Sequence, residues 1–558
     1  MKKYAWTLKT KKKPGNIDEI LEYVLEKRIG KENLNEFLTP LPPQEFLNKH
    51  EDFVSLNKDL TTAKKIIFSA IERKDPIVIH GDYDVDGQSS VAILFKTLYE
   101  DLNYKRVVPF IPSRFNEGYG LSKDSLLSIK ETLDQKFKKT YKKPLIITVD
   151  CGITAVEETK LAKKMGFEVI ITDHHRKQVV IPSPDVLVWT DLATGSGIAY
   201  LLSCVLLKNP SRHLGLACLG TICDLQPLIG FNRSVVKYGL ESLNKDMPLG
   251  LSILKSIALI KGEIDTYEVG WQIGPRLNAA GRLESALDSL RLLCTASKKQ
   301  AQKLSMDLNR LNKERQDKTI EDVKYARDIV LQKEVIPRVL IVKNENYHEG
   351  IIGLVASRIS KELNRPSLVI AIEKEKNVAK GSARSIRGIS VIDMLNKLSH
   401  LFINVGGHDM AAGFSLRLDN VEKLEKELLK YSQRLEEGLF NKFLEIDLEL
   451  DSFLASLDAY FRVMELKPFG VGNLDPTFVT KNLKLVNILN FGKENNHIKL
   501  TFIDQASKLL TGVYFNGDSL SNHLVLEEFY NVCYNLSLNT WGNTKKLELK
   551  IVDMERTL

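Results

Sequence analysis

The sequence predicts an α/β protein with a parallel-sheet domain, a long linking helix, a second and smaller α/β domain, and a C-terminal barrel-like domain of strands. Three observations predict this fold class. Short runs rich in valine and isoleucine alternate with amphipathic stretches in the first half of the chain, which is typical of a parallel sheet covered on both faces. A highly charged segment follows over 298–332, and a second alternation begins at Ile336. Strand-like runs then dominate beyond Phe440.

The elements follow from these patterns in chain order. The first sixty residues indicate mixed helix interrupted by a proline-rich break at 39–43. For the first sheet we predict strands at 76–80, 106–111, 144–149 and 168–172, with a helix over 154–165. The charged segment predicts one long helix or a broken pair, because leucine, isoleucine and valine recur there at helical spacing.

The second half of the chain gives two further groups of elements. The second α/β domain is predicted to contain a strand at 339–342, a helix over 350–363, and strands at 367–372 and 378–385. The last domain is predicted to contain strands at 444–450, 483–490, 498–503, 509–515, 530–538 and 546–552, which suits a small barrel or sandwich. The expected divisions are 1–60, 61–297, 298–335, 336–435 and 436–558.

Composition narrows the class of protein. The 558 residues are 43% hydrophobic and 27% charged, and 79 Lys and Arg against 71 Asp and Glu give a net charge of +8. Such a chain is neither globally disordered nor membrane-spanning, because its apolar stretches are far shorter than the roughly 20 residues that a spanning helix needs. The mild basicity permits a nucleic-acid partner without demonstrating one. We expect no secretory signal, and the six cysteines, without a CxxC pair, indicate reduced thiols in a cytoplasmic protein.

Acidic and imidazole side chains follow three predicted strands of the first sheet. The three segments are His80-Gly81-Asp82-Tyr83-Asp84-Val85-Asp86, Asp150-Cys151-Gly152 and Asp173-His174-His175. Because ligands bind outside the carboxyl ends of the strands in an open parallel sheet, we expect these segments to converge on one crevice. A lone aspartate at a strand end is more often a helix cap or turn former, but caps do not require imidazoles beside them.

So many carboxylates in one crevice require a cation, because like charges raise one another's pKa and destabilise the fold. A pair of divalent metal ions resolves the conflict, and the mixed histidine and carboxylate ligands suit Mn²⁺, with Mg²⁺ as the alternative. Two such ions activate a water and clamp a phosphate in nucleases and phosphatases. The Gly195-Ser196-Gly197 segment is interpreted as a loop and not as a dinucleotide-binding turn, because it lacks a third glycine.

The three segments resemble successive motifs of the DHH phosphoesterase superfamily. The resemblance continues through 112–120, 220–224, 273–282, 348–350, 381–385 and 406–408. In this order the motifs are similar, over nearly the whole chain, to the RecJ family of bacterial exonucleases. That resemblance implies a DHH domain, a DHHA1-type domain and an oligonucleotide-binding (OB) barrel. It also implies a metal-dependent enzyme that degrades single-stranded DNA 5′→3′ to 5′-mononucleotides in DNA repair and recombination, with the strand passing between the two α/β domains.

The resemblance also assigns roles to individual residues. The implied metal ligands are His80, Asp84, Asp86, Asp150, His174 and Asp224. Asp150 would bridge both metals, and Asp173 would orient the histidines beside it. His175 would contact the scissile phosphate and assist proton transfer, with Asp82 as an additional catalytic acid beside the ligands. The implied substrate-binding residues are Arg114, Tyr119, Arg276, Asn278, Arg282, Ser382, Arg384, Gly406, Gly407 and His408.

Simpler interpretations of the substrate-binding residues stay open at this point. Glycine pairs let a backbone approach a phosphate and arginine supplies bidentate contacts, but Gly406-Gly407 also suits a tight turn. The basic residues of 276–282 also suit helix salt bridges. In the last domain, aromatic side chains could stack on bases, although most aromatics on strands belong to a core. The candidates are Phe491, Tyr514, Phe515, Tyr530 and Trp541.

Two other functions share parts of this pattern. A DHH phosphoesterase that acts on short oligonucleotides or cyclic dinucleotides generally lacks the long helix and the barrel. A catalytically inactive DNA-binding scaffold would not keep an acid or histidine at every implied ligand position. The resemblance further implies single-stranded DNA, a single-strand-binding protein and a RecQ-type helicase as partners, and a monomer.

Overall fold

The computed structural model describes residues 3–113, 120–209, 212–521, 523–540 and 544–557. The chain divides into two compact units. The larger unit holds 8–311 and 446–558, and the smaller holds 312–445 together with 2–7. No helix in these described ranges is long and apolar enough to cross a membrane. All six cysteines are free thiols.

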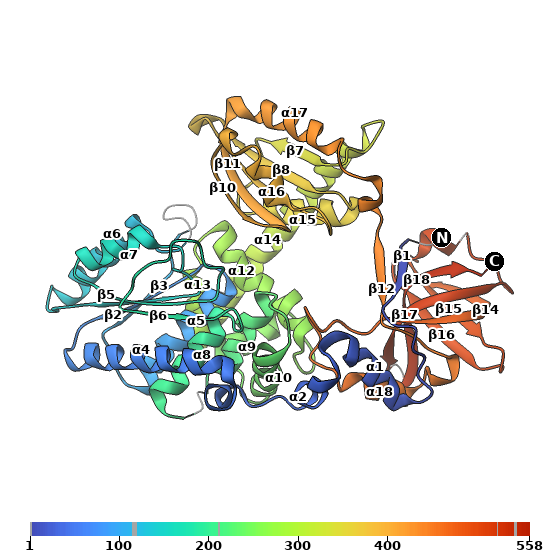
Figure 1. Ribbon diagram of the computed structural model, residues 1–558, viewed down its shortest axis with the longest axis horizontal. Coiled ribbons are helices and arrows are strands. Elements are labelled where there is room, and N and C mark those ends of the chain that lie inside the picture. Colours follow the sequence, from blue (N-terminus) through green and yellow to red (C-terminus); the bar gives the residue numbers. More distant parts are fainter. Residues whose placement is uncertain (1–2, 114–119, 210–211, 522, 541–543, 558) are drawn as a thin grey trace. The chain divides into compact units, whose positions relative to one another are not determined.

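The first domain is built on a five-stranded parallel sheet in the order β3-β2-β4-β5-β6 (Figure 1). Its strands are β2 (Ile77–Gly81), β3 (Val107–Phe110), β4 (Leu145–Val149), β5 (Glu168–Asp173) and β6 (Val186–Trp189). The first four strands lie where the sequence predicts them. The short β6 was not predicted, because its four residues follow a stretch that has no clear periodicity.

Both faces of this sheet are buried under helices, which explains the continuous apolar runs. Ile77, Ile79 and Ile147 enter one core with α4, α5 and α8, whereas Val78 and Ile146 enter a second core with α6 and α7 on the opposite face (Figure 1). The helices are α4 (Val54–Glu72), α5 (Val85–Lys96), α6 (Lys123–Phe137), α7 (Val156–Lys164), α8 (Gly195–Leu207), α9 (Leu214–Cys223), α10 (Gly230–Lys245), α11 (Leu249–Ile257), α12 (Gly274–Leu283) and α13 (Leu287–Cys294).

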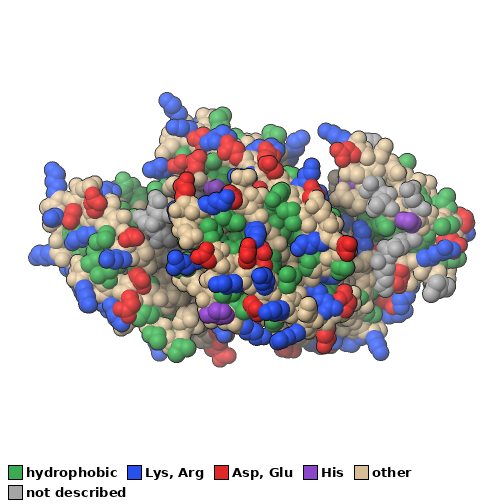
Figure 2. All heavy atoms as spheres, turned by 90° about the horizontal axis from the view of Figure 1, so that it is seen from above, with side chains coloured by type: hydrophobic (Ala, Val, Ile, Leu, Met, Phe, Trp, Pro, Cys, Tyr) green, Lys and Arg blue, Asp and Glu red, His purple; other side chains and the backbone are tan. Residues whose placement is uncertain are grey.

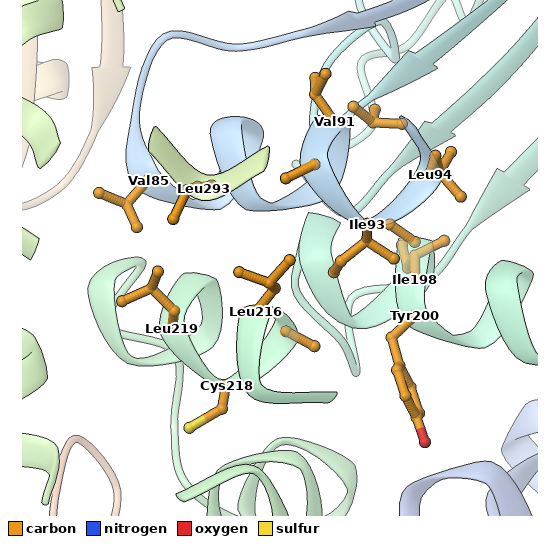
Figure 3. Packing of buried hydrophobic residues seen from close by; sticks show 14 of the residues in the cluster. Val85, Val91, Ile93, Leu94, Ile198, Tyr200, Leu216, Cys218, Leu219 and Leu293 are labelled. Carbon is orange, nitrogen blue, oxygen red and sulfur yellow. The ribbon is translucent and has the colours of Figure 1, made fainter. Parts of the chain in front are cut away.

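Helices α5, α8 and α9 pack against one another in the core of the first domain. Figure 3 shows Ile93 of α5, Ile198 of α8 and Leu216 of α9 in one buried cluster. Each of these three side chains is at most 2% exposed. The rigid packing matters because all three helices begin or end at the candidate site.

A single unbroken helix, α14 (Lys298–Leu331), leads into the smaller unit, so the one-helix alternative is correct. The sheet there has the order β10-β11-β9-β8-β7, and only β7 and β8 are parallel. Its strands are β7 (Leu340–Asn344), β8 (Ser367–Glu373), β9 (Val378–Arg384), β10 (Phe402–His408) and β11 (Ala411–Arg417). Its helices are α15 (Ile352–Leu363), α16 (Val391–Asn396) and α17 (Val421–Ser432).

The C-terminal domain is a closed five-stranded barrel, because β14 pairs with both β15 and β17 and the circuit β14-β15-β16-β18-β17 returns to β14. Its strands are β14 (Phe478–Phe491), β15 (His497–Ile503), β16 (Leu509–Tyr514), β17 (Phe529–Asn539) and β18 (Lys546–Arg556), with a short β13 (Leu448–Glu449) beside β14. The N-terminal helix α1 (Ile17–Ile29) and helix α18 (Leu457–Met464) share the barrel's core.

The ends of the smaller unit are joined by a short two-stranded sheet. In it, β1 (Ala5–Leu8) pairs with β12 (Phe443–Ile446).

Basic and acidic side chains are interspersed over the face of the molecule in Figure 2. The net positive charge is therefore not gathered into one patch on the coloured part of that face.

Candidate metal centre

The loop after β2 brings three aspartates to the carboxyl edge of the sheet. Asp84 is the N-cap of α5, and its Oδ1 accepts the backbone N–H of Gly87 at 3.0 Å. The helix-cap interpretation therefore holds for one oxygen of this residue. A Cβ on Gly87 would lie 2.5 Å from the carbonyl oxygen of Asp82, so only glycine lets the loop close this tightly.

Asp150 follows β4 and adopts an unusual backbone conformation. Its φ of +60° is left-handed, which is costly for a residue other than glycine. The backbone N–H of Asp150 is held by the carbonyl of Thr172 at 3.0 Å, and its side chain is 2% exposed. Strained residues that the surroundings hold in place cluster at functional sites.

Three carboxylates converge on one nitrogen of His174. Its Nε2 lies 3.0 Å from Asp150 Oδ1 and 3.8 Å from one oxygen each of Asp86 and Asp224. Asp224 directly follows α9 and Asp86 lies in the first turn of α5, so separate helices deliver these acids. The prediction that distant parts of the sequence meet here is correct.

Ligand atoms form three groups whose members lie within 4.8 Å of one another. The groups are Asp82 with Asp84 and Asp150, Asp86 with His174 and Asp224, and Asp150 with His174 and His175. Asp150 belongs to two groups, which is the position that a bridging ligand needs. Asp82 lies close enough to Asp84 and Asp150 to be a metal ligand itself. The resemblance implies a different role for it, that of a catalytic acid next to the ligands.

His80 lies outside these three groups. Its ring stacks on Phe110 with the centroids 5.4 Å apart, and Nδ1 contacts the Cys151 sulfur at 3.7 Å. Burial lowers the pKa of His80 to about 4, so the ring is neutral. Its Nε2 is buried without a hydrogen-bond partner among the described residues. A neutral imidazole with a free lone pair is the form that binds a metal ion.

Asp173 holds the two histidines and does not belong to any of the three groups. Its Oδ1 accepts the backbone N–H groups of His174 and His175 at 2.7 and 3.0 Å and contacts His175 Nδ1 at 2.8 Å. Its Oδ2 accepts the backbone N–H of Ile153 at 2.8 Å. This is the orienting arrangement that the sequence suggests for Asp173.

Burial and like charges raise the pKa of two acids in the cluster. Burial, together with the charges of Asp86 and Asp84, raises the pKa of Asp224 to about 8. Burial and the neighbouring aspartates also raise the pKa of Asp150 well above its ordinary value. The Asp224 Oδ2 atom is buried without a hydrogen-bond partner among the described residues. One carboxylate oxygen and one imidazole nitrogen without a hydrogen-bond partner, together with repulsion among the acids, fit a bound divalent cation.

His175 has the opposite electrostatic character. Burial opposes a charge on its ring, but the hydrogen bond and the charge of Asp173 outweigh it and raise the pKa of His175 to about 9. The side chain is 43% exposed, unlike that of His174. A protonated, accessible imidazole beside the acids can donate a hydrogen bond to a phosphate oxygen.

The substrate-binding residues predicted in the first domain have mixed outcomes. Arg114 and Tyr119 lie outside the described residues. The Nε of Arg276 donates to Asn309 Oδ1 at 3.0 Å and its Nη1 donates to the Gln272 carbonyl at 2.7 Å. The structure thus holds this guanidinium against the segment that precedes its own helix and against α14. Asn278 and Arg282 are partly exposed on α12.

In the smaller unit, predicted substrate-binding residues lie next to one another on three neighbouring strands. Ser382 of β9 pairs with Gly413 of β11, which pairs with Gly406 of β10. Arg384 pairs in the same way with Ala411, which pairs with His408. Directly opposed residues of antiparallel strands share a face, so these six residues form one surface.

The two glycines of this surface, Gly406 and Gly413, leave open space above the backbone. A Cβ at Gly406 or Gly413 would meet nothing within 4 Å. Arg384 Nη1 donates to Ser382 Oγ at 2.9 Å, and Gly353 at the start of α15 lies against both side chains. Gly407 lies on the opposite face in a strand and not in a tight turn, so the turn interpretation of Gly406-Gly407 is wrong.

Two of the predicted base-stacking aromatics are instead core residues. Tyr514 and Tyr530 are 4% and 0% exposed, because alternate residues of a barrel strand face inward. Phe491 and Phe515 flank His497, with ring centroids 5.3 and 5.2 Å from it, and Phe515 is 49% exposed. Trp541 lies outside the described residues.

Sequence reasoning missed the role of the Gly195-Ser196-Gly197 segment. It is the first turn of α8 and not a loop, because the Thr194 side chain caps the helix by accepting the Gly197 N–H at 3.1 Å. Its backbone N–H groups bind Asp86. A threonine just before a long apolar run was the signal that could have shown this helix start.

Comparison with known proteins agrees with this architecture. Three family models match the chain: the DHH family N-terminal domain over 76–221, the DHHA1 domain over 336–434 and the RecJ OB domain over 446–553. The fold and the site therefore define a protein of the DHH class, with a parallel-sheet DHH domain, a DHHA1 domain and a C-terminal OB barrel.

Relatives identify the branch within this class. The single-stranded-DNA-specific exonuclease RecJ of Thermus thermophilus is 32% identical, over 89% of this chain and 71% of the relative. The RecJ of Bacillus subtilis is 35% identical, over 89% of this chain and 63% of the relative, so the chain spans less than two thirds of that protein's length. The crystal structure of Thermus thermophilus RecJ with Mn²⁺ matches with a TM-score of 0.80 at 26% identity, covering all of this chain and 80% of the other. The chain belongs to the RecJ family.

Proposed function

We propose that this protein is a divalent-metal-dependent exonuclease that degrades single-stranded DNA 5′→3′ and releases 5′-mononucleotides. The observation that carries the proposal is the convergence of Asp86, Asp150 and Asp224 on His174 Nε2. RecJ structures have been solved with Mn²⁺ and with Mg²⁺, and the groups of acids and histidines here suit either ion. Membership of the RecJ family favours DNA over short oligonucleotides or cyclic dinucleotides.

The proposed ligands are His80, Asp84, Asp86, Asp150, His174 and Asp224, with Asp82 close enough to join them. When bound, two ions supply an activated water and neutralise the charge that develops on the phosphate. His175, kept protonated by Asp173, donates a hydrogen bond to the scissile phosphate and assists proton transfer. Strained Asp150 holds its carboxylate between two ligand groups.

The smaller unit is proposed to bind the phosphate backbone of the strand. Arg384 and His408 supply donors above a floor of glycines, on which a phosphate can approach the backbone closely. Arg276, Asn278 and Arg282 remain proposed backbone contacts of the first domain, as do Arg114 and Tyr119. The boundaries 61–297, 336–435 and 436–558 are kept as proposed domain limits.

Partners and location follow the same proposal. Single-stranded DNA is the substrate, and a single-strand-binding protein and a RecQ-type helicase are the proposed protein partners. The protein is proposed to act as a monomer in the bacterial cytoplasm, in DNA repair and recombination.

The test offers purified protein with Mn²⁺ three 5′-labelled substrates: single-stranded DNA, blunt duplex and a dinucleotide. The proposal expects labelled mononucleotide from the single strand alone, and no product when EDTA is present. Turnover of the dinucleotide alone would favour a small-substrate phosphoesterase. Binding of the single strand without turnover would favour a scaffold.

Metal binding is expected to stabilise the fold. A bound cation relieves the repulsion among the buried aspartates, so it binds the folded state. By mass action, Mn²⁺ at about 100 times its Kd adds about 2.7 kcal/mol to the free energy of unfolding. That corresponds to a rise of about 5 °C or more in the unfolding temperature of the DHH domain. Differential scanning calorimetry with and without Mn²⁺ measures the shift, and EDTA should reverse it. An unfolding temperature that does not respond to millimolar Mn²⁺ or Mg²⁺ would contradict the metal centre.

The barrel is expected to bind bases through Phe491 and Phe515. Because stacking on an aromatic contributes about 1–3 kcal/mol per base, Phe515→Ala should raise the Kd for single-stranded DNA at least about fivefold. Fluorescence anisotropy of a labelled oligonucleotide with Ca²⁺ in place of Mn²⁺ gives the Kd without cleavage. Phe453→Ala is the matched control, because Phe453 is an exposed phenylalanine of the same domain outside the cluster. Equal Kd values for the two variants would contradict the stacking role.

A further inference from the structure

Asp86 is held from two sides by the start of a neighbouring helix. The side chain is 1% exposed, and its Oδ2 accepts the Gly195 N–H at 2.8 Å while its Oδ1 accepts the Ser196 N–H at 3.0 Å. These donors belong to the first turn of α8, where backbone N–H groups have no partner within the helix. The same helix end carries a partial positive charge that favours a carboxylate.

The start of α8 is itself tied to α9, the helix that leads to Asp224. Thr194 Oγ1 lies 3.0 Å from Thr221 Oγ1, and Ser196 Oγ donates to the Ala217 carbonyl at 3.1 Å. Ala217 and Thr221 both lie within α9. One network of hydrogen bonds therefore fixes the donors of Asp86 relative to the helix that carries Asp224.

Two glycines keep space for the carboxylates at this junction. A Cβ on Gly220 would lie 2.4 Å from Asp86 Oδ1 and 2.3 Å from Ser196 Oγ. A Cβ on Gly195 would lie 2.5 Å from the Asp150 Cβ. Either side chain would displace a proposed ligand, so the close approach requires glycine at both positions.

We propose that the first turn of α8 is a positioning element for the metal centre, which presents Asp86 to a divalent cation through the N–H groups of Gly195 and Ser196. Each carboxylate oxygen has two acceptor sites, so one backbone hydrogen bond per oxygen leaves a second site for the cation. The two bonds fix the carboxylate plane while Oδ2 lies 3.8 Å from His174 Nε2. This inference rests on the proposed function, because it takes Asp86 as a ligand.

The test compares two substitutions at one residue. Ser196→Pro removes the N–H donor, and proline is tolerated in the first turn of a helix. Ser196→Ala keeps the N–H and loses the same hydroxyl, so it is the matched control. Isothermal titration with Mn²⁺ alone, without DNA, should give a Kd at least about tenfold weaker for Ser196→Pro than for Ser196→Ala, as expected when a group that orients a ligand is lost. Circular dichroism checks that each variant is folded.

A second pair covers the case in which Ser196→Pro does not fold. Gly220→Ala pushes against Asp86, whereas Gly215→Ala adds the same methyl group to the same helix against Leu243. The Mn²⁺ Kd should weaken at least about tenfold for Gly220→Ala and stay within about threefold of wild type for Gly215→Ala. Mn²⁺ binding that is equal within both pairs, with wild type binding normally, would overturn the positioning role and leave the proposed function intact. A wild-type protein that binds no Mn²⁺ would overturn both.

Discussion

Replacing Asp150 by asparagine should lower exonuclease turnover at least about 10³-fold, which is about 4 kcal/mol of activation free energy. The reason is that Asp150 belongs to two of the three ligand groups, so its loss weakens both proposed metal positions. Asparagine tolerates the left-handed backbone at this position better than alanine does. Initial rates of mononucleotide release from a labelled single strand measure the change.

The same variant should not lose stability in the absence of metal. Burial and the neighbouring aspartates raise the pKa of Asp150 well above its ordinary value, so a neutral amide removes a repulsion that the metal-free fold bears. Its unfolding temperature in EDTA should equal or exceed that of wild type. Asp191→Asn, at an exposed aspartate of the same domain, is the control for both readouts. Asp150→Asn with substantial turnover and normal Mn²⁺ binding would contradict the bridging assignment.

Replacing His175 by alanine should lower kcat by about 10² to 10⁴-fold, the range that a positioned proton-transfer group contributes. The ring is held by Asp173 at 2.8 Å and is the more exposed of the two adjacent histidines, so it can reach a bound phosphate. Single-turnover cleavage under saturating enzyme isolates this step from DNA binding.

Mn²⁺ titration of the His175→Ala variant separates the two roles that the geometry allows. A phosphate contact predicts a Mn²⁺ Kd within about threefold of wild type, whereas a metal ligand predicts a large loss of affinity. His400→Ala, at an exposed histidine of the smaller unit, controls for the loss of an imidazole. Unchanged kcat in His175→Ala would contradict a catalytic role.

Much of the fold and of the metal centre could be predicted because both follow from backbone periodicity. Buried parallel strands appear as continuous apolar runs, and the carboxyl ends of such strands meet at one edge of the sheet. His80 lies near the end of such a strand and Asp150 and His174 follow two others, so their approach to one edge needed no knowledge of side-chain packing.

The features that could not be predicted depend on side-chain direction or on backbone donors. Tyr514 and Phe515 are adjacent in the sequence, yet one enters the barrel core and the other faces outward. The exposed, glycine-containing β10 has no alternation of apolar and polar residues to reveal it. Ser196 acts on Asp86 through its backbone N–H, which every residue except proline carries, so residue identity alone gives no signal.

Anomalous diffraction from crystals grown with Mn²⁺, recorded at the manganese absorption edge, tests the central claim most directly. We expect two peaks about 3.5–4 Å apart, with the Asp150 carboxylate touching both and with Asp86, His174 and Asp224 around one of them. A single peak away from these side chains, or no peak at a Mn²⁺ concentration that supports cleavage, would contradict a metal pair held by this cluster.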